Sequence, residues 1–471
     1  MFAYRFLLAC LAAAPAGVSF AAPVPAAFSY SDNGGVPVQD RAVKSTARSP
    51  QAGTAAAGHE DGTQSPALTR RYLQTLVREG LNYSSEIKSA QAGADASRFE
   101  VERVKGERYP QVRLSTGSPL AGKSAGKSRG GVKDTSATLS ATTTLYDFGH
   151  KKNRILGGEE TVRAADEETR LTRDQIAAEI VISVAMVDRF QRALVIAGEY
   201  ESRMKKLTGM LSEITQTDGG RQSELVQARS RLLQAQTHVH QIETHLDEVL
   251  LKLTRLTGKR IALKNRLDWD GLGSIPLESV LQNLDNHPQL MKSQAQIRAG
   301  QHEVEAAKSS RLPSVNWTVS RSIDRNNSDD WYTGVNLEWD IFTGGSATAS
   351  VNAASQRAQA ARMEYETSLH ELQYRIRDLA RSREASVRKT GEYDALAQET
   401  GRIRDMFYEQ WFSLGTRTLL DVLSAENEHF TAGISRIDNQ FEAWSAGISL
   451  MSESSGLLKW LDLGGMAADD N

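Results

Sequence analysis

The sequence predicts a mainly α-helical protein with a small β part, in which long coiled-coil helical hairpins accompany four strands. Three observations support this fold class: a large internal repeat, heptad spacing of apolar residues over long stretches, and segments in which apolar and polar residues alternate. The composition agrees with it. Only 40% of residues are hydrophobic and 24% are charged, which suits long solvated helices better than a thick globule.

The first residues predict an exported protein. A short cationic start, an apolar run and small residues up to Ala21 and Ala22 are typical of a secretory signal, which we assign to residues 1–22. Cleavage there would remove Cys10, the only cysteine, and with it any disulfide or thiol chemistry. Because the residues before Cys10 resemble a lipoprotein cleavage box, its lipidation stays open. Residues 23–65 are rich in Ala, Gly, Pro, Ser and Thr, so we expect a flexible segment.

An internal repeat organises the remaining chain. We place the first copy at residues 66–258, a linker at 259–286, the second copy at 287–460 and a C-terminal tail at 461–471. Each copy is expected to contain a helix, a proline stop, two strands, a glycine break and a long helical hairpin. The segments that match are Arg108-Tyr109-Pro110 with Arg311-Leu312-Pro313, and Tyr146-Asp147-Phe148-Gly149 with Trp339-Asp340-Ile341-Phe342.

The predicted strands alternate between apolar and polar residues. Val315, Trp317 and Val319 have polar neighbours on both sides, and in the first copy Leu139, Ala141, Thr143 and Leu145 alternate with Ser140, Thr142 and Thr144. Segments of about 10 residues with this period are typical of membrane barrel strands. A soluble antiparallel sheet with one wet face is the alternative. Four strands cannot close a membrane-spanning barrel, so the barrel interpretation requires several chains.

No apolar run beyond the signal is long enough for a transmembrane helix, so a membrane-embedded chain would have to be a β-barrel. Tyr146, Trp317, Trp331 and Trp339 would suit the aromatic belts at the membrane interfaces.

The long helices carry coiled-coil seams. Apolar residues recur every seven positions, and a companion series follows three positions on. The two series in the first copy are Leu225, Leu232, Val239, Leu246 and Leu253, and Ala228, Ala235, Ile242, Val249 and Leu256; the main series in the second copy is Leu423, Phe430, Ile437, Trp444 and Met451. The proline-free stretch 154–212 would span roughly 90 Å as a helix. We expect Asp218-Gly219-Gly220 and Leu414-Gly415 to reverse the chain.

The stretch from Gly415 to Ala425, GTRTLLDVLSA, and its weaker counterpart at Gln222 to Arg229 resemble the TolC family of outer-membrane efflux and secretion channels. The resemblance covers essentially all of residues 66–460. It implies a homotrimer in which four strands per chain form a twelve-stranded β-barrel in the lipid outer membrane, continued by a helical tunnel in the periplasm. It implies no catalytic site and no cofactor.

The resemblance also implies a periplasmic gate at the hairpin tips. Asp421 matches an aspartate of the family's constriction, so three copies would form an anionic ring that favours cations. Arg417 and Glu224 match positions that link neighbouring hairpins. Phe412 stands where a linking tyrosine is expected, and Ser424 where a second aspartate would be, so one hydroxyl link is lost and the ring is single. A solvated i,i+4 pair between Arg417 and Asp421 is the alternative.

Other motifs that look chemical have simpler interpretations. Gly117 to Ser124 fits the phosphate-loop formula, but loop composition follows it, so we expect a basic external loop and no nucleotide. His238, His240 and His245 share a predicted helix without metal-binding spacing, so we expect no metal. The net charge of −2 gives no basic field for nucleic acid.

The expected function is passive conduction as the exit duct of a tripartite export system. A periplasmic adaptor protein and an inner-membrane ABC or proton-driven transporter would dock at the hairpin tips. Family likeness around Tyr146 to Gly149 and Gly415 to Ala425 favours type I protein secretion over multidrug efflux. The first alternative is a periplasmic adaptor, which would need a lipoyl-like split motif and a single hairpin. The second is an exported hydrolase, which the lack of a convergent Ser-His-Asp or metal set disfavours.

Overall fold

The computed structural model describes residues 65–117, 122–124, 127–129, 136–263, 266–269, 276–324 and 329–464. The predicted signal peptide at 1–22, residues 23–64 of the predicted flexible segment and residues 465–471 of the predicted tail lie outside these residues. In the described part, no helix combines the length and the apolar character needed to cross a membrane.

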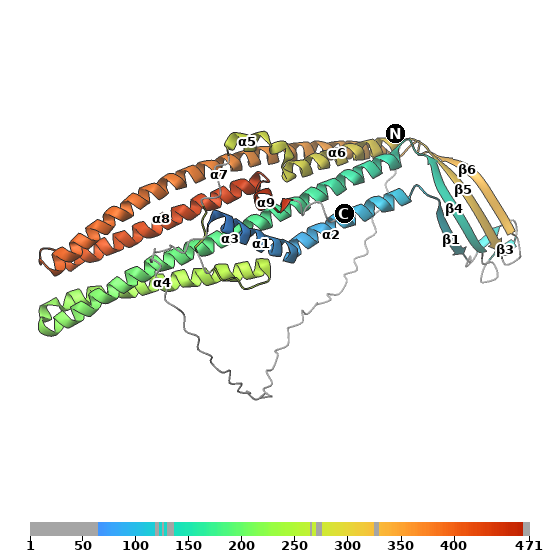
Figure 1. Ribbon diagram of the computed structural model, residues 1–471. Helices are drawn as coiled ribbons and strands as arrows, with labels where there is room; N and C mark the ends of the chain where they lie inside the picture. Colours follow the sequence, from blue (N-terminus) through green and yellow to red (C-terminus); the bar gives the residue numbers. More distant parts are fainter. Residues whose placement is uncertain are drawn as a thin grey trace, which may run out of the picture. The chain divides into compact units, whose positions relative to one another are not determined.

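Two long helical hairpins, which confirm the mainly α fold class, make up most of the described chain (Figure 1). In the first, α3 (His150–Thr217) pairs with α4 (Gln222–Thr257); in the second, α7 (Ser346–Phe412) pairs with α8 (Leu419–Glu453). The shorter helices are α1 (Pro66–Tyr83), α2 (Ser85–Gly106), α5 (Leu277–Gln282), α6 (Pro288–Ser309) and α9 (Leu457–Trp460), with 3-10 turns η2 (Gly219–Arg221) and η4 (Leu284–Asn286).

The two longest helices begin in the same way, which reflects the internal repeat. Gly149 precedes α3 with φ 86° and Gly345 precedes α7 with φ 90°, a left-handed conformation that glycine adopts without strain. Asp147 secures the first start, because its two carboxylate oxygens accept hydrogen bonds from the backbone N–H groups of Gly149 (3.1 Å) and Lys151 (3.0 Å). These helix starts fix the positions at which the chain leaves the sheet and enters the long hairpins.

The predicted heptad series form the seams of the hairpins. Leu225, Ala235 and Leu253 of α4 are buried, as are Leu423 and Ile437 of α8. Toward the hairpin ends, residues of α3, α4, α7 and α8 share one apolar cluster, whose buried members include Met204, Leu211, Leu225, Trp411, Leu419, Val422 and Leu423. The two hairpins of one chain are therefore packed together near their tips.

Trp269 anchors the linker between the repeats to α3 and α8. Its indole N–H donates to the Asp188 carboxylate over 2.9 Å, and its ring stacks on Trp444 with centroids 5.6 Å apart. Arg192 pairs with the same carboxylate at 3.0 Å and donates to the carbonyl oxygen of Leu267, also at 3.0 Å. Since Asp188 has no exposed surface, these contacts hold a charged group inside the apolar core.

The four predicted strands are present and form one antiparallel sheet in the order β1-β4-β5-β6. They are β1 (Gln111–Gly117), β4 (Ser136–Tyr146), β5 (Ser314–Asp324) and β6 (Asp329–Glu338). Two short strands, β2 (Gly122–Ser124) and β3 (Lys127–Arg129), pair separately. The stretch expected to be a loop is thus partly a β-hairpin, and the end of the phosphate-loop match lies on a strand instead of opening a helix.

Candidate functional site

Both hairpin tips are tight turns held by their own side chains. At the first tip, the Asp218 carboxylate accepts a hydrogen bond from the backbone N–H of Gly220 at 3.0 Å. At the second, Gly415 has φ 63°, which lets the chain turn sharply between α7 and α8. The predicted reversals at these glycines are therefore confirmed.

Asp421 caps α8. Its carboxylate accepts hydrogen bonds from the backbone N–H (3.1 Å) and hydroxyl (2.9 Å) of Thr418, and its own N–H donates to that hydroxyl, which makes a capping box. The bonds from Thr418 lower the pKa of the Asp421 carboxyl below its ordinary value, and the charge of Arg417 adds to the effect. Asp421 is thus ionised and held in one position at the tip.

Arg417 turns away from Asp421 and back onto α7. Its Nε donates to the side-chain oxygen of Gln410 at 3.1 Å, and its guanidinium lies 4.2 Å from the ring centroid of Phe407. Within the described residues it forms no ion pair with Asp421, although its charge still acts on that carboxyl. Phe412, 57% exposed, stacks on Tyr408 at the same end of α7 with ring centroids 6.0 Å apart.

Glu224 lies in the first turn of α4, on the other hairpin. One of its carboxylate oxygens is 4.0 Å from Arg221, and that oxygen is buried without a hydrogen-bond partner in the described structure. Ser424 is half-buried one turn after Asp421 on α8. Among the described residues, no hydrogen bond or ion pair joins Glu224 to Arg417 or Asp421, so a single chain does not make the predicted hairpin links.

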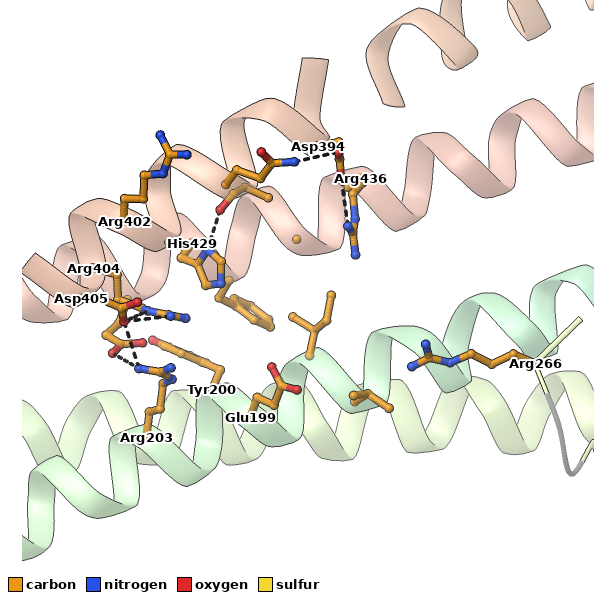
Figure 2. Close-up of a pocket in the computed structure, with 18 residues that line it drawn as sticks. Glu199, Tyr200, Arg203, Arg266, Asp394, Arg402, Arg404, Asp405, His429 and Arg436 are labelled. Carbon is orange, nitrogen blue, oxygen red and sulfur yellow. Dashed lines mark hydrogen bonds and ion pairs between the residues drawn. The ribbon is translucent and has the colours of Figure 1, made fainter. Parts of the chain in front are cut away.

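A polar cavity that the sequence did not indicate lies between α3 and the second hairpin (Figure 2). Its volume is about 570 Å³. Arg203 of α3 crosses this seam, with its Nη1 atom 3.4 Å from the Glu426 carboxylate of α8 and 3.8 Å from the Asp405 carboxylate of α7. Asp405 also accepts from the neighbouring Arg404 at 2.9 Å.

Burial shifts the pKa of two ionisable groups that line this cavity. Glu426 is 3% exposed, and burial raises the pKa of its carboxyl against the opposing pull of Arg203 and Arg404. Burial lowers the pKa of His429, whose Nδ1 lies 3.1 Å from the carbonyl oxygen of Ala397. The sequence signal for this site is weak: a single glutamate within an apolar helical stripe.

The sheet has one apolar and one polar face. Register places Val112 and Leu114 of β1 beside Ala141 and Leu139 of β4. The apolar face continues through these residues of the other strands: Val315, Trp317, Val319, Ile323, Val335 and Leu337. The opposite face carries Ser, Thr, Asn and charged residues, with a hydroxyl pair across the strands between Thr138 and Ser322 at 3.0 Å. Large apolar side chains on this sheet stay exposed in the single chain, as Val335 does at 62%.

The four predicted interface aromatics lie toward the two ends of the sheet. Tyr146 and Trp317 are near the end of the sheet that joins the helices, and Trp331 is near the other end. Trp339 directly follows β6, and its indole N–H donates to the carbonyl oxygen of Arg311 at 3.1 Å. Trp331 and Trp339 are about 26 Å apart along an extended chain. Membrane strands are tilted by about 35–45°, so this separation corresponds to roughly 20 Å of membrane height, somewhat less than the apolar band of about 25 Å.

A profile of the family described as outer membrane efflux protein matches residues 76–259 and 280–452, more than half of the chain. The chain belongs to the outer membrane efflux protein family. This efflux protein is 22% identical over 469 residues to the probable outer membrane lipoprotein SilC of Salmonella typhimurium, covering 96% of each chain. Its fold is similar to the crystal structures of CusC (20% identity, TM-score 0.72, 81% of this chain and 91% of that one) and of VceC from Vibrio cholerae (18%, 0.73, 83% and 99%).

The protein is therefore an outer membrane efflux channel that extends into the periplasm, and not an enzyme. Channels of this TolC-like family form trimers and work within tripartite pumps. The alternative of a periplasmic adaptor is wrong, since the chain belongs to the efflux protein family and its described residues form two long helical hairpins, where an adaptor required one.

Proposed function

We propose that three copies of this chain assemble into a channel whose four-stranded sheets close into one twelve-stranded barrel. The observation that carries the proposal is the sheet itself. Its apolar face, running from Val112 to Leu337, would meet lipid, and its hydroxyl-rich face would line a watery passage. Its outer strands, β1 and β6, each have one edge unpaired within the sheet, which strands of neighbouring copies would complete.

We propose the hairpin tips as the periplasmic gate. Asp421, fixed by its capping box, would contribute one carboxylate to a three-fold ring that attracts cations. Arg417 and Glu224 would link hairpins of neighbouring chains, because within one chain they lie on different hairpins without a mutual contact. Phe412 lacks the hydroxyl of a linking tyrosine, and Ser424 lacks the charge of a second aspartate. This gate would therefore be weaker than one that has both a tyrosine and an aspartate at these positions.

For the cargo, we propose small molecules. The expected preference for type I protein secretion gains no support from the relatives, whereas the family is described as one of efflux proteins. An inner-membrane ABC or proton-driven transporter and a periplasmic adaptor would deliver the cargo to the tips, and this chain would supply no chemical step.

We also propose the processing and the segment boundaries predicted above: a signal at 1–22, a flexible segment at 23–65, repeats at 66–258 and 287–460, a linker at 259–286 and a tail at 461–471. The relative SilC is named a lipoprotein, so the N-terminus needs a direct test. Mass spectrometry of the mature chain should give a start after Ala21 or Ala22. A lipid-bearing start at Cys10 would contradict the proposed cleavage.

Planar-bilayer conductance tests the channel and its gate. The purified protein should migrate as a heat-sensitive trimer and conduct ions. Asp421→Asn removes the ring's charge and should lower cation selectivity, and Thr418→Val, which weakens the cap but keeps the carboxylate, is the matched control. A monomeric chain that passes no ions would refute the channel, and unchanged selectivity in Asp421→Asn would refute the ring.

A further inference from the structure

The seam between the two hairpins of one chain changes character along its length. Near the tips it is an apolar cluster, with Leu211 of α3 and Trp411 of α7 both buried. Farther from the tips, the cavity of about 570 Å³ opens between the same helices, and charged side chains line it (Figure 2). Buried apolar contacts do not respond to pH, whereas a buried carboxylate beside a cavity can.

Glu426 is the carboxylate best placed to do so. It projects from α8 toward the cavity, is 3% exposed, and lies 3.4 Å from Arg203 of α3. Arg203 also lies 3.8 Å from the Asp405 carboxylate of α7, so two carboxylates share its single positive charge. The contact between the hairpins therefore contains a carboxylate that is buried and only partly neutralised.

We propose that Glu426 is a proton-binding site that couples the packing of the two hairpins to pH, with Arg203 as its counter-ion. The inference rests on the proposed function only in that hairpin separation would open a channel. Its direction follows from burial. A carboxyl that is deeply buried when the hairpins are packed, and hydrated when they separate, binds its proton more tightly in the packed state.

The surrounding charges set the size of this effect. Other titratable groups line the cavity from every neighbouring element: from α3, Glu199, Tyr200 and Arg203; from the linker, Arg266; from α7, Asp394, Arg402, Arg404 and Asp405; and from α8, His429 and Arg436. The charge of Arg231 on α4 also acts on Tyr200. For Glu426, burial is the largest influence and raises its pKa, Asp405 raises it further, and Arg203 and Arg404 lower it. Packing is thus favoured when Glu426 is protonated, and this contribution is lost as pH rises through the raised pKa.

His429 works in the opposite direction. Burial and the charge of Arg404 lower its pKa, so the packed state prefers its neutral form. Its Nδ1 lies within hydrogen-bond distance of the Ala397 carbonyl, a contact inside the second hairpin that hairpin separation need not break. Glu426, by contrast, contacts the other hairpin directly.

The distance between the hairpins, measured by pulsed dipolar spectroscopy, tests this proposal without relying on conduction. Spin labels would be attached at Lys206→Cys on α3 and Glu409→Cys on α7, both exposed, with labelled chains diluted among unlabelled ones so that distances within a chain dominate. In the otherwise unchanged protein, the packed population should grow as pH falls from 8 to 5, a range chosen to span raised carboxyl pKa values.

Three variants separate the outcomes. Glu426→Gln should stay packed and lose the pH response. Arg203→Gln removes the counter-ion that reaches Glu426 from the other hairpin. The ratio of packed to separated hairpins should therefore fall about tenfold at pH 8, the effect of losing one charge-assisted hydrogen bond, and recover at pH 5. Glu428→Gln, which alters an exposed carboxylate two residues along α8, is the matched control and should behave like the parent protein.

An unchanged pH response in Glu426→Gln would overturn the proposal. If Glu426→Gln does not fold, Arg203→Gln decides the question. Hairpins that remain packed at pH 8 without the Arg203 guanidinium would also overturn the proposal. A chain that shows the pH response but no conductance would refute the proposed channel and leave the proton site standing.

Discussion

The contact between Trp269 and Asp188 should determine how firmly the linker is held on the helices. Trp269→Phe keeps most of the buried ring and removes the indole N–H that donates to Asp188 over 2.9 Å. The other oxygen of this carboxylate already lacks a hydrogen-bond partner among the described residues, and no surface of Asp188 is exposed. Losing a hydrogen bond to a buried charge costs about 2 kcal/mol. Local opening of the linker should therefore become about 30-fold more frequent.

Limited trypsin digestion measures this opening, because Lys259, Arg260 and Arg266 are cleavage sites within the linker. When opening and closing are fast relative to cleavage, the cleavage rate follows the population of the open form. Trp411→Phe is a suitable control: this buried tryptophan lies near the hairpin tips, far from the linker in the chain. Equal cleavage rates in Trp269→Phe and the parent protein would show that the hydrogen bond does not hold the linker.

Three further predictions follow from burial and packing. Val335→Arg should reduce the yield of membrane-inserted trimer, since a charge at the lipid midplane costs about 2–4 kcal/mol, whereas Asn336→Arg on the polar face should insert normally; similar yields would contradict the assignment of faces. Gly158→Ala should lower thermal stability by about 1–3 kcal/mol, because the added methyl would lie 2.8 Å from Val101; an unchanged melting temperature would argue against this close packing of α2 on α3. Burial raises the pKa of Asp174 to about 6, opposed by Ser455, Lys459 and Arg170. Protonated Asp174 therefore stabilises the fold at pH values below the ordinary pKa of an aspartate, and this stabilisation is lost as pH rises through about 6. Asp174→Asn should make the melting temperature less dependent on pH between pH 5 and 7, the window that spans the raised pKa.

The amino-acid sequence by itself determined the repeat, the two hairpins and the alternation of the strands. These features are local or periodic. Heptad spacing places Leu225 and Leu253 on one helical face whatever lies opposite, and the glycines at 149, 345 and 415 allow backbone conformations that other residues resist. The Asp147 cap at the start of α3 is local in the same sense.

Only the tertiary structure decided the register of the sheet. The alternation in the sequence places Leu145 on the same face as Leu139, but a register shift between Thr144 and Tyr146 pairs Tyr146 with Val315 instead. A β-bulge of this kind moves the following side chains to the opposite face, and a single strand carries no signal for it because the bulge depends on the partner strand.

Tertiary structure also decided what the charged residues do. The spacing of Arg417 and Asp421 allowed an ion pair, yet Arg417 packs on Phe407 across the turn between α7 and α8, while Asp421 joins Thr418 in a capping box, which is a local contact. Glu426 meets Arg203 across more than 200 residues of sequence. Which buried charges face one another depends on how separate helices pack, and neither composition nor periodicity records that arrangement.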